Sequence, residues 1–148
     1  MKKQTKYSAH DRRKEVLTNL KGFGGTLYEQ MEKGIFPWIK MPSRSIENIY
    51  YDQKVRQYVL GDKSVRRSSR NIRHIRPFTQ LVWAARFADE LTKHRKTSTL
   101  REVYYSAQAY EMTFTDQQES NNIVTDLETV LGFSREDFNI FPEERSAV

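Results

Sequence analysis

The stretch "STLREVYYSAQAY" (98–110) decides how the second half of the chain folds. Thr99 is followed three residues later by Glu102, which is the spacing of a capping box and fixes where a helix starts. Apolar side chains then recur at the spacing i, i+3, i+4, i+7, on Leu100, Val103, Tyr104 and Ala107. The pattern predicts a short, well-capped helix with one buried stripe, and Tyr104 belongs to that stripe.

The second tyrosine of this stretch, Tyr105, is predicted to lie on another face of the helix. Adjacent helical residues point about 100° apart, so the two tyrosines cannot face the same core. Arg101, Tyr105 and Gln108 follow at i, i+4, i+7 and form a polar face. A tyrosine, with an ordinary pKa of about 10, is a poor nucleophile at neutral pH. A fixed cation nearby favours the phenolate, and an arginine can also hold a phosphate oxygen.

These properties make Tyr105 a candidate nucleophile and Arg101 its candidate electrostatic partner at a phosphate. The alternative is an ordinary exposed tyrosine with an i, i+4 contact to an arginine. Since the chain has eight tyrosines, helical geometry by itself favours that alternative.

Further helices are predicted on both sides of this stretch. The apolar stripes of "RPFTQLVWAARFADELTKHR" (76–95) and "TDQQESNNIVTDLETVLGF" (115–133) are each typical of an amphipathic helix. "DFNIF" (137–141) predicts a short strand, and "PEERS" (142–146) predicts the start of a turn. Three helices followed by a strand and a turn are the order of a winged helix–turn–helix. Because the return strand of a wing would begin at Val148, we expect the chain to be a piece of a longer protein.

The beginning of the chain predicts another helix. In residues 8–34 apolar side chains recur at spacings of 4, 3, 4 and 4, which indicates one amphipathic helix or two, ending at Gly34. Three glycines interrupt the pattern and predict a kink or a break: Gly22, Gly24 and Gly25. A phosphate-binding loop is the weaker alternative, because no Lys-Ser/Thr follows the glycines and no strand precedes them.

Two shorter segments connect this helix to the rest. "FPWIKMPSRS" (36–45) predicts a proline-punctuated linker, and "NIYYDQKVRQYVLGD" (48–62) predicts a β-hairpin. We therefore expect a mainly α fold with small β elements, of the α+β class. Residues 1–45 form an N-terminal helical extension with its linker, and residues 46–148 form a CAP-like winged-helix domain.

The charge of the chain is unevenly distributed. Residues 1–96 carry 22 Lys and Arg against 9 Asp and Glu, whereas residues 97–148 carry 3 against 10. The basic side chains peak in "KSVRRSSRNIRHIR" (63–76), which contains no acid. Such a block is either a solvated face or a surface for a polyanion, and the interleaved Ser and Asn favour nucleic acid. The candidate DNA-backbone contacts are Arg66, Arg67, Arg70 and Arg73.

Several classes of protein are excluded or disfavoured. Without cysteine there are no disulfides and no thiolate metal sites. No stretch has the roughly 18 apolar residues of a membrane span, and the N-terminus lacks the apolar core of a secretory signal. No metal site is expected, because the three histidines are far apart and Asp126 and Glu128 flank Leu127 on a predicted helix. An intracellular, cytoplasmic protein fits these observations.

Three segments carry a resemblance to a known family: "RSIENIYYDQKVRQYVLGDKSVRRSSRNIRHIRPFTQ" (44–80), "TSTLREVYYSAQAY" (97–110) and "DQQESNNIVTDLETVLGFSREDFNIFPEERSA" (116–147). They closely resemble the N-terminal part of the A subunits of archaeal DNA topoisomerase VI, a family homologous to the meiotic double-strand-break transesterases. The resemblance runs in order from about residue 25 to the end. Its most specific element is R-[DE]-x-x-Y, which begins at Arg101.

The resemblance implies a DNA topoisomerase of type IIB whose winged helix carries the catalytic tyrosine. That tyrosine falls on Tyr105, the motif arginine on Arg101 and its acidic neighbour on Glu102. It attacks a DNA phosphodiester and forms a 5′-phosphotyrosyl link. Two A subunits cut the two strands of a duplex, and ATP-binding B subunits complete an A2B2 assembly associated with the nucleoid.

The resemblance also implies a Toprim domain that holds Mg²⁺ and lies outside these residues. The 148 residues are therefore expected to be inactive alone. The helix of residues 8–34 is a candidate docking surface for a B subunit, and packing on its own domain is an equally open reading. The alternative function is a non-enzymatic winged-helix DNA-binding protein that lacks the Toprim domain.

Overall fold

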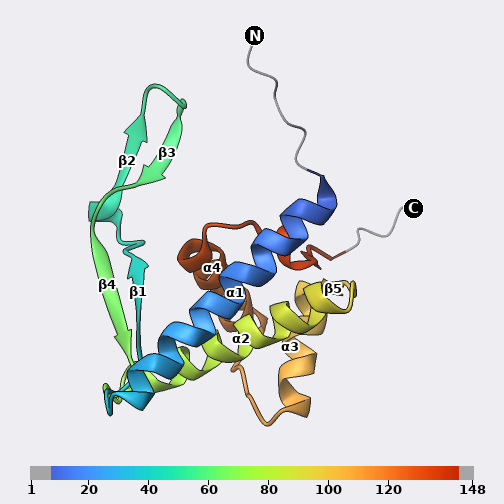
Figure 1. Cartoon of the computed structure of the whole chain (residues 1–148). Coiled ribbons are helices and arrows are strands. Elements are labelled where there is room, and N and C mark those ends of the chain that lie inside the picture. Colours follow the sequence, from blue (N-terminus) through green and yellow to red (C-terminus); the bar gives the residue numbers. More distant parts are fainter. Residues whose placement is uncertain (1–7, 144–148) are drawn as a thin grey trace.

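The computed structural model describes residues 8–143, and within this range the chain forms four α-helices and three two-stranded sheets (Figure 1). The helices are α1 (Ala9–Glu32), α2 (Ile75–Lys93), α3 (Leu100–Ala109) and α4 (Gln117–Leu131). The strands are β1 (Trp38–Pro42), β2 (Ile49–Asp52), β3 (Gln57–Leu60), β4 (Ser64–Ser68), β5 (Ser98–Thr99) and β6 (Ile140–Phe141). Two 3₁₀ helices are η1 (Ile46–Asn48) and η2 (Arg135–Phe138). The predicted α+β class is confirmed.

Helix α1 runs without interruption through its three glycines, so the predicted break is wrong. The hydroxyl of Ser8 caps its start and accepts a hydrogen bond from the N–H of Asp11 (3.2 Å). Side chains on both sides of the glycines are buried, namely Val16, Leu20 and Leu27. Their packing outweighs the low helix propensity of glycine. Glycines inside a helix form no phosphate-binding loop, so that alternative is wrong too.

One hydrophobic core joins α1 to the later helices. Its buried members include Leu20 of α1, Leu81 of α2, Val103 of α3, Leu127 of α4 and Ile140 of β6. The stripe predicted for residues 76–95 lies inward along α2. The expected boundary at residue 45 therefore does not separate two cores, and α1 packs its apolar stripe on its own chain.

The segment predicted as a linker contains a strand instead. β1 pairs with β4 in an antiparallel ladder, in which Lys40 lies opposite Arg66 and Ile39 lies opposite Arg67. The two prolines that suggested a linker are Pro37, just before β1, and Pro42, at its last position. Proline is tolerated at such strand ends, because it interrupts no bond of the ladder interior. We refer to β1 and β4 together as the ladder.

The hairpin predicted in residues 48–62 is confirmed by the pairing of β2 with β3. It projects away from the helices (Figure 1). The buried side chain of Asn48 fixes its base, because Nδ2 donates to the carbonyl of Ser43 (2.6 Å) and Oδ1 accepts from the N–H of Lys63 (3.0 Å). A Cβ on Gly61 would lie 2.7 Å from Asn48 Oδ1, so this position has no room for a side chain.

The predicted order of three helices and a strand is also confirmed, as α2, α3, α4 and β6. β5, just before α3, pairs in parallel with β6. Glu119 near the start of α4 joins α4 to α2. Its carboxylate accepts hydrogen bonds from Arg76 Nε (3.1 Å) and Gln80 Nε2 (2.9 Å). Burial on its own raises the pKa of Glu119, but bonds from Arg76, Gln80 and Thr115 outweigh burial and lower the pKa to about 2. The turn predicted for residues 142–146 lies largely outside the described residues.

Candidate functional site

Helix α3 presents the candidate nucleophile on a firmly fixed backbone. The predicted capping box is present: the N–H of Glu102 donates to Thr99 Oγ1 (3.1 Å), and Glu102 Oε2 accepts from the N–H of Thr99 (2.7 Å). Val103 is buried and α3 packs on α4. One face of α3 is thereby held against the core, and the other is turned to solvent.

The two tyrosines of α3 differ in exposure as predicted, although Tyr104 is only half-buried rather than buried. Tyr105 is 53% exposed, whereas Tyr104 is half-buried and packs against the core. Their rings lie 5.2 Å apart in an edge-on arrangement. Tyr104 therefore serves as a packing platform that supports the exposed ring of Tyr105. An apolar side chain at position 104 without a ring would leave Tyr105 freer to rotate.

Arg101 lies beside Tyr105, one turn before it on the same face. Its Cζ is 6.0 Å from the centroid of the Tyr105 ring, at the outer limit of a cation–π contact. Among the described residues its guanidinium makes no ion pair. An exposed phenol and an uncompensated guanidinium on neighbouring turns can act together on one phosphate group.

The two adjacent arginines of β4 point in opposite directions, because successive strand side chains alternate between faces. The Arg67 guanidinium turns inward, and its Nη2 lies 3.0 Å from Oδ2 of Asp126, which is 3% exposed. Arg66 turns outward, and its Cζ lies 4.0 Å from the centroid of the Trp38 ring. The four candidate DNA contacts are therefore not equivalent, since Arg67 is committed to a carboxylate of α4.

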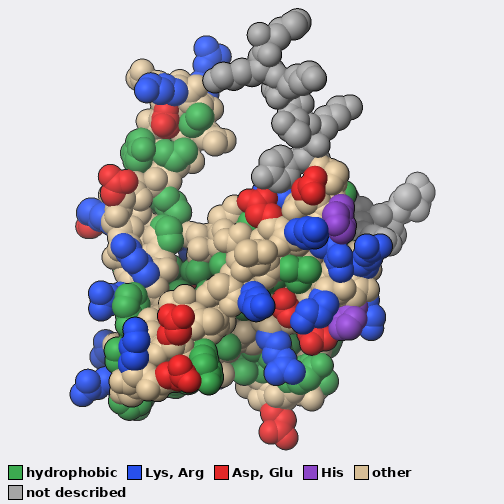
Figure 2. Space-filling model, in the orientation of Figure 1, with side chains coloured by type: hydrophobic (Ala, Val, Ile, Leu, Met, Phe, Trp, Pro, Cys, Tyr) green, Lys and Arg blue, Asp and Glu red, His purple; other side chains and the backbone are tan. Residues whose placement is uncertain are grey.

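The other two candidates follow the ladder. Arg70 lies in the turn after β4, with its Cζ 5.9 Å from the centroid of Phe36, and Arg73 is exposed just before α2. Figure 2 shows Lys and Arg side chains gathered along the side of the molecule that the ladder forms. Arg66 on β4 and Arg70 in the turn after it are both exposed, each beside an aromatic ring of the segment 36–38. Tyr105 belongs to α3, which Figure 1 shows on another side of the molecule.

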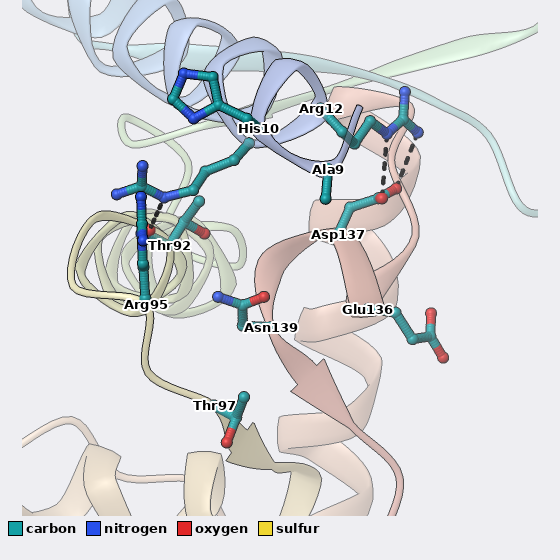
Figure 3. Close-up of a pocket in the computed structure, with 10 residues that line it drawn as sticks. Ala9, His10, Arg12, Thr92, Arg95, Thr97, Glu136, Asp137 and Asn139 are labelled. Atoms are coloured by element: carbon teal, nitrogen blue, oxygen red, sulfur yellow. Dashed lines mark hydrogen bonds and ion pairs between the residues drawn. The ribbon is translucent and has the colours of Figure 1, made fainter. Parts of the chain in front are cut away.

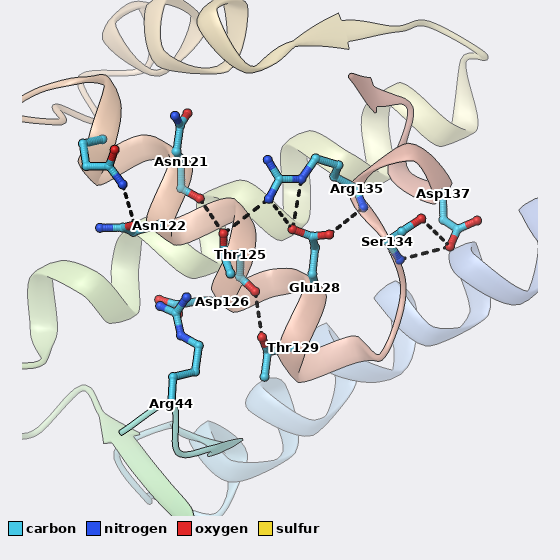
Figure 4. Close-up of polar contacts among 11 residues, drawn as sticks. Arg44, Asn121, Asn122, Thr125, Asp126, Glu128, Thr129, Ser134, Arg135 and Asp137 are labelled. Carbon is cyan, nitrogen blue, oxygen red and sulfur yellow. Dashed lines mark hydrogen bonds and ion pairs between the residues drawn. The ribbon is translucent and has the colours of Figure 1, made fainter. Parts of the chain in front are cut away.

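Two carboxylates of α4, those of Asp126 and Glu128, pair with arginines. Asp126 also pairs with Arg44, from the segment after β1 (Figure 4). Glu128 points to another side of α4, where its Oε1 accepts from Arg135 Nη2 (2.7 Å). Within residues 8–143 no three His, Asp or Glu side chains come together as metal ligands do. Asp126 and Glu128 are therefore both engaged by arginine side chains.

A recess of about 520 Å³ lies between the start of α1, the end of α2 and η2 (Figure 3). Arg13 crosses it and donates to the carbonyl of Thr92 (2.8 Å), so it caps the end of α2. Arg12 pairs with Asp137 (3.0 Å), and this bond keeps the pKa of Asp137 below its usual range. These contacts seat α1 on its own domain.

Sequence reasoning missed three residues that organise the basic surface: Trp38, Lys40 and Arg44. The available signal was the alternation in "WIKMP", where Ile39 and Met41 are buried and Lys40 between them is exposed. No described helix combines the length and the apolar character needed to span a membrane.

Comparison with known proteins shows which family the chain resembles. A family model described as "Type IIB DNA topoisomerase" matches residues 76–140. The chain is 42% identical over 137 residues to the A subunit of type 2 DNA topoisomerase 6 from Methanothermobacter thermautotrophicus, covering 93% of this chain and 39% of that protein. It is 35% identical to the same subunit of Pyrococcus abyssi, covering 90% and 36%, and 36% identical to that of Halobacterium salinarum, covering 90% and 37%.

The chain thus spans a little more than a third of the length of these relatives. The family model matches α3, which contains Tyr105, and the neighbouring helices α2 and α4. Over about nine-tenths of its own length, the chain is similar to the A subunits of type IIB DNA topoisomerases.

Proposed function

We propose that this chain is the DNA-binding, nucleophile-bearing part of a topoisomerase VI A subunit, with Tyr105 as the nucleophile. The observation that carries the proposal is the pairing of an exposed phenol, Tyr105, with the uncompensated guanidinium of Arg101 on one face of a capped helix. The similarity to these A subunits and the R-[DE]-x-x-Y element at Arg101 support it.

The proposed reaction is a transesterification. The Tyr105 hydroxyl oxygen bonds to a backbone phosphorus and loses its proton to the solvent, while the bond from phosphorus to the 3′ oxygen breaks. The 3′ oxygen takes up a proton, so the products are a 3′-hydroxyl and a 5′-phosphotyrosine, and resealing is the reverse. Arg101 holds a non-bridging oxygen of the phosphate and offsets its growing negative charge.

The assembly we propose is that of the family. A winged helix–turn–helix is built on α2, α3 and α4, and two A subunits act with two ATP-binding B subunits on duplex DNA in the cytoplasm. Mg²⁺ would be held by a Toprim domain, and it supplies charge neutralisation at the phosphate. The carboxylates of α4 that are paired with arginines play no part in that site.

A trapped covalent complex tests the nucleophile. An A subunit containing this chain is incubated with its B subunit, ATP, Mg²⁺ and supercoiled plasmid, quenched with detergent and digested to peptides. We expect the nucleotide adduct on the peptide of α3, at Tyr105. An adduct at Tyr104 or on another tyrosine would overturn the assignment.

The second candidate function is a DNA-binding protein without cleavage activity. The commitment of Asp126 and Glu128 to arginines favours it for the chain alone, because these carboxylates are not available to a metal. We expect the 148 residues to bind plasmid and to leave it uncut in Mg²⁺. Linear plasmid attached to the isolated chain would show that a metal site lies within it.

A further inference from the structure

The outward face of the ladder holds two opposed cations with no acidic side chain beside them in sequence. Lys40 and Arg66 lie directly opposite each other on it, both exposed. Directly opposed side chains of an antiparallel pair share a face with their Cβ atoms about 5 Å apart, so two like charges there are destabilising. No acidic residue occurs in segments 34–46 or 63–76 to offset them.

Trp38 restrains one of these two cations. The guanidinium Cζ of Arg66 lies over its indole ring, 4.0 Å from the centroid, and the Arg66 side chain remains exposed. Neither Arg66 nor Lys40 makes an ion pair with any residue in the described range. The donors of a planar, oriented guanidinium match the oxygens of a phosphate.

The inward face of the same ladder shows what a purely structural arginine does here. Arg67, one residue later, pairs with the buried Asp126 and ties β4 to α4. Within the described residues, the inward arginine thus has a carboxylate partner and the two outward cations have none. The outward pair is therefore free to accept an anion from a partner.

We propose that the ladder face, formed by Trp38, Lys40 and Arg66, binds the phosphate backbone of duplex DNA, with Trp38 as the residue that positions Arg66. The proposal rests on the proposed function, from which it takes duplex DNA as the partner. On this surface the four candidate arginines are not equivalent. Lys40 and Arg66 neutralise phosphates, Trp38 orients the guanidinium of Arg66, and Arg67 anchors β4 to α4.

The test measures binding of the 148-residue chain to a short labelled duplex of mixed sequence across a salt titration. Arg66→Gln and Lys40→Gln should each reduce the slope of log K against log salt by about 0.9, because each removes one phosphate contact. The matched control is Arg95→Gln, which removes one exposed charge just beyond the end of α2, and α2 itself is about 28 Å long. It should leave the slope unchanged.

Trp38 is tested by separating slope from affinity. Trp38→Leu should weaken binding about two- to fivefold and keep the slope, because the charge remains but is no longer oriented. Trp38→Phe should restore most of the affinity. In an Arg66→Gln background Trp38→Leu should have no further effect, whereas a merely structural role would weaken binding equally in both backgrounds. Thermal melting of each variant shows that it is folded.

The outcomes distinguish failure of the ladder-face proposal from failure of the proposed DNA-binding function. Equal slopes for the parent chain, Arg66→Gln and Lys40→Gln, or an equal loss from Arg95→Gln, would overturn the ladder face while DNA binding stands. A parent chain that binds no duplex would overturn both. The covalent assignment to Tyr105 is measured independently of either.

Discussion

Helix α3 and strand β4 each contain two adjacent identical residues, and each element gives the two residues different tasks. In α3, Tyr104 is half-buried and Tyr105 is exposed. In β4, Arg67 pairs with a buried carboxylate and Arg66 faces outward. The helix separates neighbours by about 100° and the strand by about 180°. The period of the backbone therefore decides which of two identical side chains is available to a partner.

The two regions differ in how the second residue of each pair is used. Tyr104 packs edge-on against Tyr105 and supports it directly. Arg67 instead holds the strand on α4 through Asp126. Substitutions at the supporting residue should therefore be mild in α3 and severe in β4.

The largest effect is expected at the exposed tyrosine. Tyr105→Phe removes the proposed nucleophilic oxygen from an exposed ring, so cleavage by the complete A and B assembly should disappear while the melting temperature stays the same. Tyr104→Phe keeps the supporting ring, so activity should be retained. Covalent complex is measured after a detergent quench. Loss of cleavage in both variants would show that the faces of α3 do not separate the two roles.

Arg101→Ala should slow single-turnover cleavage by about 10²–10³-fold, the usual cost of losing one donor to the transition state. DNA binding should change little. Gln108→Ala is the matched control, because Gln108 is exposed on the same face beyond Tyr105. If the two variants cleave at equal rates, the guanidinium beside Tyr105 has no part in the chemistry.

In β4 the inward residue should control stability. Arg67→Met leaves Asp126 buried with Arg44 as its remaining partner, and should lower the free energy of unfolding by about 2 kcal/mol. Arg66→Met should cost less than about 1 kcal/mol, because it breaks no buried ion pair. Urea denaturation measures both. Equal losses would mean that the alternation along β4 does not divide anchoring from binding.

A pH dependence is expected in the helical region. The pKa of Glu119 is about 2 in the folded chain, below its ordinary value of 4.5. A carboxylate whose pKa is lower in the folded than in the unfolded chain stabilises the fold at pH values above its unfolded pKa. The contribution of Glu119 to stability should therefore be present above pH 4.5 and be lost as the pH falls toward 2. Glu119→Gln should flatten this part of the stability profile. A profile identical to that of the parent chain would show that the hydrogen bonds of Glu119 do not stabilise the packing of α2 on α4.

The sequence predicted α3 well because its signals are local. The capping residues Thr99 and Glu102 and the apolar stripe all lie within one short segment. β4 was not predicted, because its partner β1 lies far earlier in the chain, between two prolines. Without knowledge of this strand pairing, the basic segment 63–76 gave no reason to distinguish among its four candidate arginines. Register between distant strands depends on tertiary packing, which a local pattern does not contain.

The glycines of α1 have a consequence for the order in which the molecule opens. A Cβ at Gly22, Gly24 or Gly25 would meet nothing within 4 Å, so these positions gain no packing from being glycine. Each costs the helix about 1 kcal/mol relative to alanine, and α1 stays helical through its contacts with α2 and η2. It should open as a unit before the rest, with amide hydrogens that exchange at a lower free energy than those of α2. Alanine at the three positions should slow that exchange and leave the exchange of α2 unchanged.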